Sequence, residues 1–203
     1  MYKKTTGSDG RHRNSAVYVN PNVTNILKTL ENETRDPALS NSVYFGPTAL
    51  THIRRLIDKG GSIITDTALL ANDIDSHLLG DKGAQILCFI DDPQVVSLAE
   101  QRHITRAEVA VDYGLAVPGP KLMVVGSAPA AINRIIVRRR SEPMSEVCVL
   151  AAPNGFASVV QMKERLMESD LTSIIVRGKK GGIPVTVSLM NAILREIAEN
   201  PKG

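Results

Sequence analysis

The feature of this sequence that most constrains its fold is an alternation between short apolar segments and longer segments with helical spacing. The apolar segments are rich in β-branched residues and lie at 61–65, 85–90, 121–125, 146–150 and 172–176. Each has the length of a strand, and most are apolar at consecutive positions, which is typical of strands covered by helices on both faces. We expect these five segments to form a buried sheet.

Between these segments, apolar residues recur at three- and four-residue spacing. In 47–58, Leu50, Ile53 and Ile57 would share one helix face, and two glycines follow as a stop signal. The same spacing predicts helices at 23–30, 95–102, 106–113, 129–139, 157–169 and 184–198. Strands that alternate with helices in this way are typical of βαβ crossovers. The sequence therefore predicts an α/β fold in three layers: a mostly parallel sheet of about five strands with helices on both faces.

Length and composition favour one domain. The chain has 203 residues, of which 43% are hydrophobic and 22% are charged. These values are ordinary for a globular protein, and they exclude a chain that is disordered throughout. Residues 1–16 are polar and carry Lys3, Lys4, Arg11 and Arg13 against a single acid, so we expect a flexible tail there. Residues 17–203 would then form one α/β domain.

The sequence favours a cytoplasmic protein. No apolar run approaches the roughly 18 residues that a membrane helix needs, and the basic N-terminal segment lacks the apolar stretch of a secretory signal. The two cysteines, Cys88 and Cys148, lie in apolar segments without zinc-site spacing, so we expect buried free thiols and no metal. Aromatic residues make up only 3% of the chain, which argues against a base-stacking platform for nucleic acid.

The loops after the strands contain the candidate ligand-binding residues. In a parallel sheet these loops converge at the carboxyl edge, where ligands bind. Their sequences are TDT (65–67), DDP (91–93), GSAP (126–129), APNGF (152–156) and RGKKGG (177–182). Small residues let a ligand approach the backbone, helix N-termini favour anions, and the last loop adds three cations. We expect a basic edge that binds a large, negatively charged ligand.

Each loop on its own also has a simpler explanation. GSAP lacks the GxGxxG spacing and is explained by a helix start that Ser127 caps, whereas RGKKGG is explained by a solvated basic turn. Arg106 is either an ordinary surface residue or a clamp for a carboxylate. Asp91 and Asp92 before a proline indicate a cap or turn, and no histidine has the spacing of a catalytic triad.

The order and wording of these loops resemble the precorrin-8X methylmutase family, also called precorrin isomerase, of the cobalamin pathway. The resemblance covers residues 45–194 and is carried by six stretches: GGSIITDT (60–67), CFIDDPQV (88–95), ITRAEVAVD (104–112), VVGSAPAAINRI (124–135), PNGFASVVQMKERL (153–166) and VRGKKGGIPVTVSLMNAIL (176–194). Each stretch alone is weak, but six in the family's order make a specific match.

The resemblance implies a three-layer α/β homodimer that binds a corrin precursor, a large flexible tetrapyrrole with many acid side chains. It implies an isomerase that moves a methyl group between adjacent ring carbons and needs no cofactor. Cations would contact the acidic periphery, and small residues would let the flat ring approach the backbone. For the glycines, ordinary turn geometry is the alternative. The substrate-binding residues predicted in this way are Thr65, Asp66, Arg106, Gly126, Ser127, Ala128, Pro129, Asn154, Gly155, Phe156, Gly178, Lys179, Lys180, Gly181 and Gly182.

The sequence departs from the family at the expected proton donor. Family members carry a histidine upstream of the phenylalanine that corresponds to Phe45, and it is taken to protonate the macrocycle, a role that suits an imidazole. An ungapped count back from Phe45 places Asn32 there, and asparagine cannot supply a proton at neutral pH. The catalytic residue is therefore unknown, with Glu31, Glu33 and His52 as candidates for another acid.

The resemblance leaves several functions open. The first is a methylmutase-like isomerase that uses another acid, and a different role on a related tetrapyrrole is equally compatible. A non-catalytic tetrapyrrole-binding paralogue is the next alternative. A nucleotide- or nucleic-acid-binding module that uses the basic loops is the reading we favour least, so we expect a tetrapyrrole as partner and neither nucleic acid nor a membrane.

Overall fold

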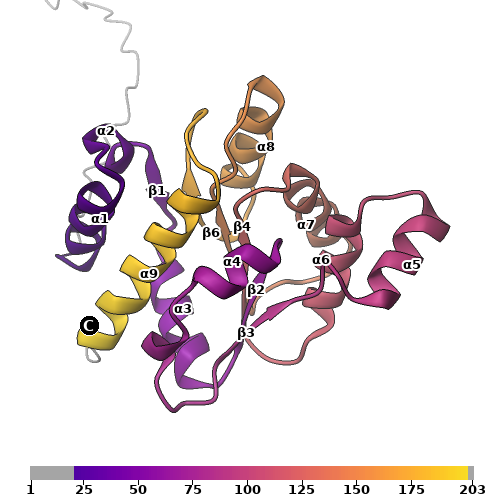
Figure 1. Cartoon of the computed structure of the whole chain (residues 1–203), viewed down its shortest axis with the longest axis horizontal. Coiled ribbons are helices and arrows are strands. Elements are labelled where there is room, and N and C mark those ends of the chain that lie inside the picture. Colours follow the sequence, from indigo (N-terminus) through magenta and orange to yellow (C-terminus); the bar gives the residue numbers. More distant parts are fainter. Residues whose placement is uncertain (1–20, 201–203) are drawn as a thin grey trace, which may run out of the picture.

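Helices pack on both faces of a six-stranded sheet in the computed structural model, which describes residues 21–200 (Figure 1). The strand order is β1-β6-β5-β4-β2-β3. Five parallel strands match the five predicted segments: β2 (Ser62–Thr65), β3 (Gln85–Cys88), β4 (Lys121–Val125), β5 (Val147–Ala151) and β6 (Thr172–Val176). The predicted tail, 1–16, lies outside the described residues.

A sixth strand, β1 (Val43–Phe45), was not predicted. It pairs antiparallel with β6 at the edge of the sheet, with Val43 opposite Val176. Its three residues are half-buried, and a strand of this length is too short to show a periodicity in the sequence. The prediction of a mostly parallel α/β sheet is confirmed, with one strand more than expected.

The strands of the sheet send alternate side chains to opposite faces. In β4, Leu122 and Val124 join one apolar core, whereas Met123 and Val125 join the other. Helices α1 (Pro21–Thr34), α3 (Ala49–Asp58), α4 (Ala68–Asp73) and α9 (Ile183–Glu199) contribute to the first core. Helices α6 (Arg106–Ala116), α7 (Pro129–Ser141) and α8 (Ala157–Met167) cover the second. The predicted three layers follow from this alternation.

The remaining helices are short or peripheral. Helix α5 (Pro93–Arg102) packs against α6 around a small separate core and stands out from the body in Figure 1. The two short elements α2 (Pro37–Ser40) and η1 (Ser76–Leu79) lie in connections. Both cysteines are free, as expected, but only Cys148 is fully buried, and burial raises the pKa of its thiol to about 12. Cys88 is half-buried.

The strand order fixes where a ligand site can form. Across the parallel strands, the chain passes from β2 to β3 on one side and from β4 to β5 and β6 on the other. Loops on the two sides of such a reversal diverge and leave a crevice outside the carboxyl ends of the strands. The loop after β2 and the loop after β4 flank this reversal, and those after β5 and β6 follow along the same edge.

Candidate functional site at the carboxyl edge

The carboxylate of Asp66 closes the turn after β4. Asp66 follows β2 directly and is only 7% exposed. Its Oδ2 accepts hydrogen bonds from the backbone N–H of Ser127 (2.8 Å) and of Ala128 (2.7 Å), and its Oδ1 accepts one from Gly126 (3.2 Å). The N-cap of α7 is Ala128, which supplies no side-chain cap, so the interpretation of Ser127 as the cap is wrong. The N–H groups that we expected to be free for an anionic ligand are bound by Asp66.

Burial and hydrogen bonding act on Asp66 in opposite directions. Burial raises the pKa of its carboxyl group because a charged carboxylate loses its hydration, and the three N–H donors only partly oppose this. Asp66 and Thr65 border a cavity of about 10 Å³, which is room for no more than one water molecule. The hydroxyl of Thr65 donates to the carbonyl of Thr67 at 3.0 Å. These two predicted site residues therefore make internal contacts at the switch point, beside a cavity too small for a large ligand.

Gly126 lies where α4 and α9 approach the sheet. A Cβ atom at this position would be 2.8 Å from Oγ1 of Thr186 and 2.9 Å from Cδ1 of Leu70. Both distances are shorter than side chains tolerate, so packing alone requires glycine here. The sequence left ordinary turn geometry as the alternative to ligand contact for this glycine. The structure gives another reason, which is close packing against α4 and α9.

The loops after β5 and β6 are joined into a single unit, which we call the double loop (152–156 and 177–182). The N–H of Gly182 donates to the carbonyl of Ala152 at 2.7 Å, and the N–H of Gly155 donates to that of Lys179 at 3.2 Å. At Gly181 the chain passes so close that a Cβ atom would be 2.0 Å from the oxygen of Ala152. Backbone hydrogen bonds thus hold together two loops that we predicted to bind the ligand.

A buried lysine that we did not predict lies beneath the double loop. Lys163 of α8 is 1% exposed, and its Nζ donates to the carbonyls of Pro153 (2.9 Å) and Lys180 (3.1 Å). Burial lowers the pKa of Lys163 to about 8. The sequence carried a signal for it: Val159 and Leu166, four positions before and three after, are core residues on the same helix face.

The predicted cations differ in how they are paired. Lys180 binds the carboxylate of Asp36 at 2.5 Å, and this hydrogen bond lowers the pKa of Asp36. The guanidinium of Arg106, at the start of α6, lies 3.8 Å from the carboxylate of Asp91 in the loop after β3. Lys179 is exposed and has no ion-pair partner within residues 21–200. Arg177 of the same loop also has no acid partner among these residues, and its guanidinium donates to the carbonyl of Asn41 at 3.0 Å.

Several other predicted residues lie at the surface of this edge. Phe156, which precedes α8, is 82% exposed, an uncommon state for a large apolar side chain. Ser127, Asn154 and Gly178 are exposed, and Ala128, Pro129 and Gly155 are half-buried. These residues remain accessible to a ligand, whereas Asp66 and Gly126 are not.

The candidate proton donors of the N-terminal region lie on α1. Asn32 is exposed and is four residues before Asp36, which pairs with Lys180 at the carboxyl edge. Of its neighbours, Glu31 accepts a hydrogen bond from the hydroxyl of Ser40, and Glu33 pairs with Arg195 at 3.2 Å. Both glutamates are therefore engaged within the protein.

His52 lies at the opposite edge of the sheet. It is half-buried on α3, next to the backbone of Lys121 and Glu146 at the amino ends of β4 and β5. Burial lowers the pKa of its imidazole, and Nε2 has no hydrogen-bond partner among the described residues. Its place at the amino edge and its lowered pKa both argue against His52 as the proton donor for a ligand at the carboxyl edge.

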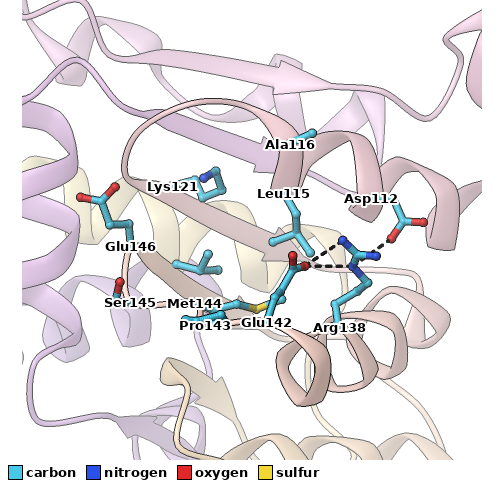
Figure 2. A pocket seen from close by; sticks show the side chains of 11 residues that line it. Asp112, Leu115, Ala116, Lys121, Arg138, Glu142, Pro143, Met144, Ser145 and Glu146 are labelled. Carbon is cyan, nitrogen blue, oxygen red and sulfur yellow. Dashed lines mark hydrogen bonds and ion pairs between the residues drawn. The ribbon is translucent and has the colours of Figure 1, made fainter.

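A polar hollow of about 460 Å³ also lies at the amino edge (Figure 2). Figure 2 shows Arg138 between two acids: it pairs with Glu142 at 2.8 Å and with Asp112 at 3.7 Å. The Nζ of Lys121 donates to the carbonyl of Gly119 at 2.8 Å. These cations are bound by groups of the protein itself. The hollow therefore lacks an exposed cation without a partner, such as Lys179 of the double loop, for an acidic ligand.

Two further properties concern metals and membranes. Within residues 21–200, no three His, Cys, Asp or Glu side chains are grouped so that they could hold a metal ion. Among the helices of the same residues, none combines the length and apolar character needed to cross a membrane.

Comparison with known families decides the assignment of the chain. A family model described as precorrin-8X methylmutase matches residues 10–196, which include all the loops described above. The chain belongs to the precorrin-8X methylmutase family. The resemblance seen in the six sequence stretches is thereby confirmed.

Individual members of the precorrin-8X methylmutase family agree in sequence and in fold. The cobalt-precorrin-8 methylmutase of Salmonella typhimurium is 31% identical over 175 residues, 86% of this chain and 81% of that protein. That of Methanothermobacter thermautotrophicus is 30% identical over 169 residues, 83% and 78% of the two chains. The structure of precorrin-8X methylmutase from Thermus thermophilus superimposes with a TM-score of 0.79 at 26% identity, over 89% and 87% of the chains.

Proposed function

We propose that this chain is an isomerase of cobalamin biosynthesis that moves a methyl group between adjacent ring carbons of a precorrin-8-type tetrapyrrole. The observation that carries the proposal is the family match over residues 10–196, together with two relatives, 30% and 31% identical, that are named cobalt-precorrin-8 methylmutase. The arrangement of the chain supports it, because the matching loops lie along one edge of one sheet.

The substrate would bind over the double loop. A tetrapyrrole with acid side chains needs cations at its rim and an apolar contact for its ring. Lys179 supplies an exposed ammonium, Arg106 and Lys180 supply cations that exchange one acid partner for another, and the exposed ring of Phe156 supplies the apolar contact. Ser127 and Asn154 lie between these groups in the order of the strands and offer hydrogen bonds.

The proton donor is a separate question. Asn32 stands at the position that the ungapped alignment gives to the family histidine, and an amide cannot donate a proton at neutral pH. Its neighbour Asp36 contacts Lys180 of the double loop, so the end of α1 lies beside the proposed ligand site. We infer that the acid comes either from this segment or from the acidic substrate itself.

Two further properties are proposed on family likeness. The chain would act as a homodimer, and it would work in the cytoplasm. Size-exclusion chromatography with light scattering at several concentrations tests the first property. A monomer at all concentrations would reject it.

The decisive experiment is incubation of the purified protein with precorrin-8X and, separately, with cobalt-precorrin-8. A methylmutase changes the visible spectrum without changing the mass, because an isomerisation conserves atoms, and NMR then shows that one methyl group has moved. The Salmonella typhimurium relative, run on the same substrate, serves as the positive control. Unchanged spectra with both substrates at stoichiometric protein, while the control converts its substrate, would reject the proposal.

The same experiment separates the alternatives. A shifted pigment spectrum on binding without any product would identify a non-catalytic tetrapyrrole-binding protein. Absence of any spectral change, combined with affinity for DNA that falls steeply with salt, would favour a nucleic-acid-binding module.

A further inference from the structure

Lys163 is the largest of the fully buried side chains in the described part of the chain. It forms no ion pair with any of residues 21–200, although a buried ammonium without an acid partner is unfavourable. A methionine of similar volume would fill this space without burying a charge. Packing alone therefore does not explain why a lysine occupies this position.

The hydrogen bonds of Lys163 indicate its role. Its ammonium carries three N–H donors, of which two reach the carbonyls of Pro153 and Lys180, one in each half of the double loop. Each of these carbonyls directly precedes or follows residues that we assign to the ligand, Asn154 and Lys179. Lys163 thus connects from below the two loops that would bind the ligand from above.

We propose that Lys163 is a positioning residue of the substrate site, which fixes the double loop by bridging its two halves and adds a buried positive charge beneath it. The inference rests on the function proposed above, because the charge is assigned to attraction of the acidic tetrapyrrole. The bridge by itself is a property of the protein without ligand.

The charged groups around Lys163 come from three elements. Glu164 lies next to it on α8, and both border a hollow of about 360 Å³ together with Arg177. The loop after β6 adds Lys179 and Lys180, and the latter is paired with Asp36 beyond α1. Because cations outnumber acids here, loss of the charge on Lys163 would weaken the attraction of an anion to this site but would not abolish it.

The pKa of Lys163 offers a readout that a purely structural role would not affect. With a pKa of about 8, its charge is lost between pH 7 and pH 9, whereas a neutral amine still donates two hydrogen bonds. Affinity for precorrin-8X should fall over this range in the wild-type protein. In Lys163→Arg the guanidinium remains charged, so this decline should disappear.

The test compares Lys163→Met and Lys163→Arg with the wild type and with Arg165→Met, which removes an exposed cation from the same helix. The first measurement is amide hydrogen exchange of Gly155 and Gly182 without ligand. We expect exchange about tenfold faster in Lys163→Met and unchanged exchange in Arg165→Met. The second is the affinity for precorrin-8X at pH 7 and pH 9, where we expect Lys163→Met to bind about tenfold more weakly at pH 7.

The outcomes decide the two proposals separately. Unchanged exchange in a folded Lys163→Met variant would overturn the bridge. If that variant does not fold, an equal decline of affinity with pH in the wild type and in Lys163→Arg would overturn the role of the charge. If the wild type binds no precorrin-8X, the proposed function fails, and the exchange measurement still decides whether Lys163 positions the double loop.

Discussion

Replacement of Gly181 by alanine tests whether the double loop is as tightly joined as its contacts indicate. Gly181 has a φ of +142°, a conformation that side chains rarely adopt, and its Cα faces the carbonyl oxygen of Ala152. An added Cβ would lie 2.0 Å from that oxygen, so the two loops must separate. Separation breaks the 2.7 Å hydrogen bond from Gly182 to Ala152 and disturbs the carbonyls that Lys163 binds.

The expected cost follows from these contacts. A non-glycine residue in a sparsely populated backbone conformation costs about 1–3 kcal/mol. A buried N–H that loses its partner, here that of Gly182, costs a further 1–3 kcal/mol or so. We therefore expect Gly181→Ala to lower the free energy of unfolding by roughly 2–6 kcal/mol, a large fraction of the stability of an ordinary domain.

Gly178 provides a matched control in the same loop. It also has a positive φ, +68°, but no atom lies within 4 Å of the position of an added Cβ. Gly178→Ala should cost only about 1–2 kcal/mol, from backbone strain alone. Urea unfolding followed by circular dichroism measures both variants under the same conditions. Equal losses in the two variants would show that the halves of the double loop are not in contact, and the reasoning would be wrong.

Three other predictions follow from the site. The folded-state pKa of Lys163, about 8, lies below its ordinary value of 10.5, so between these values the folded protein binds fewer protons than the unfolded one. The free energy of unfolding of the wild type should therefore rise relative to that of Lys163→Met between pH 8 and pH 10.5, by at most about 3 kcal/mol. A difference between the two proteins that does not change with pH would contradict this prediction. Lys179→Ala and Arg106→Ala should each weaken precorrin-8X binding about tenfold in a spectral titration, since a carboxylate loses its cation, and unchanged affinity would reject the contact. Asn32→His should raise the rate of methyl migration in the spectral assay, and full wild-type turnover without any gain would show that the alignment of the missing acid is wrong.

The fold was predictable because each buried strand is covered on both faces. The segment 121–125 matches β4 residue for residue, since its apolar run is bounded by polar and turn residues. The predicted strand 85–90 is longer than β3, which ends at Cys88. In this edge strand the apolar run continues into the loop, where Phe89 packs on Tyr113 of α6 instead of on a strand. Apolarity alone does not separate these two uses.

The contacts of the site were only partly predictable. Asp66 was identified as a site residue from its position after a strand, but its binding to 126–128 depends on β2 and β4 being neighbours in the sheet. No local pattern contains that information, because the partners are some 60 residues apart. Lys163 is a different case: its place in the apolar stripe of a helix was visible in the sequence.

The pairing of charges was beyond the reach of the sequence. The loop 177–182 predicts a basic surface, yet Lys180 is bound by Asp36, which lies 144 positions away in the chain. Such a pair forms only when the segment between α1 and α2 folds back beside the loop after β6. A count of cations in a loop therefore overestimates the charge that a ligand meets, and the acid partners have to be found in three dimensions.

These observations move the expected ligand site along the edge of the sheet. At the switch point between β2 and β4, the carboxylate of Asp66 already occupies the N–H groups that open α7. Acid groups of a ligand must then be met by side-chain cations, those of the double loop and Arg106. Exposed cations such as Lys179 are screened by salt over about 8–10 Å, whereas the buried ammonium of Lys163 is screened much less. Affinity that persists at high salt would therefore depend on Lys163, because it is the cation of this site that solvent ions reach least.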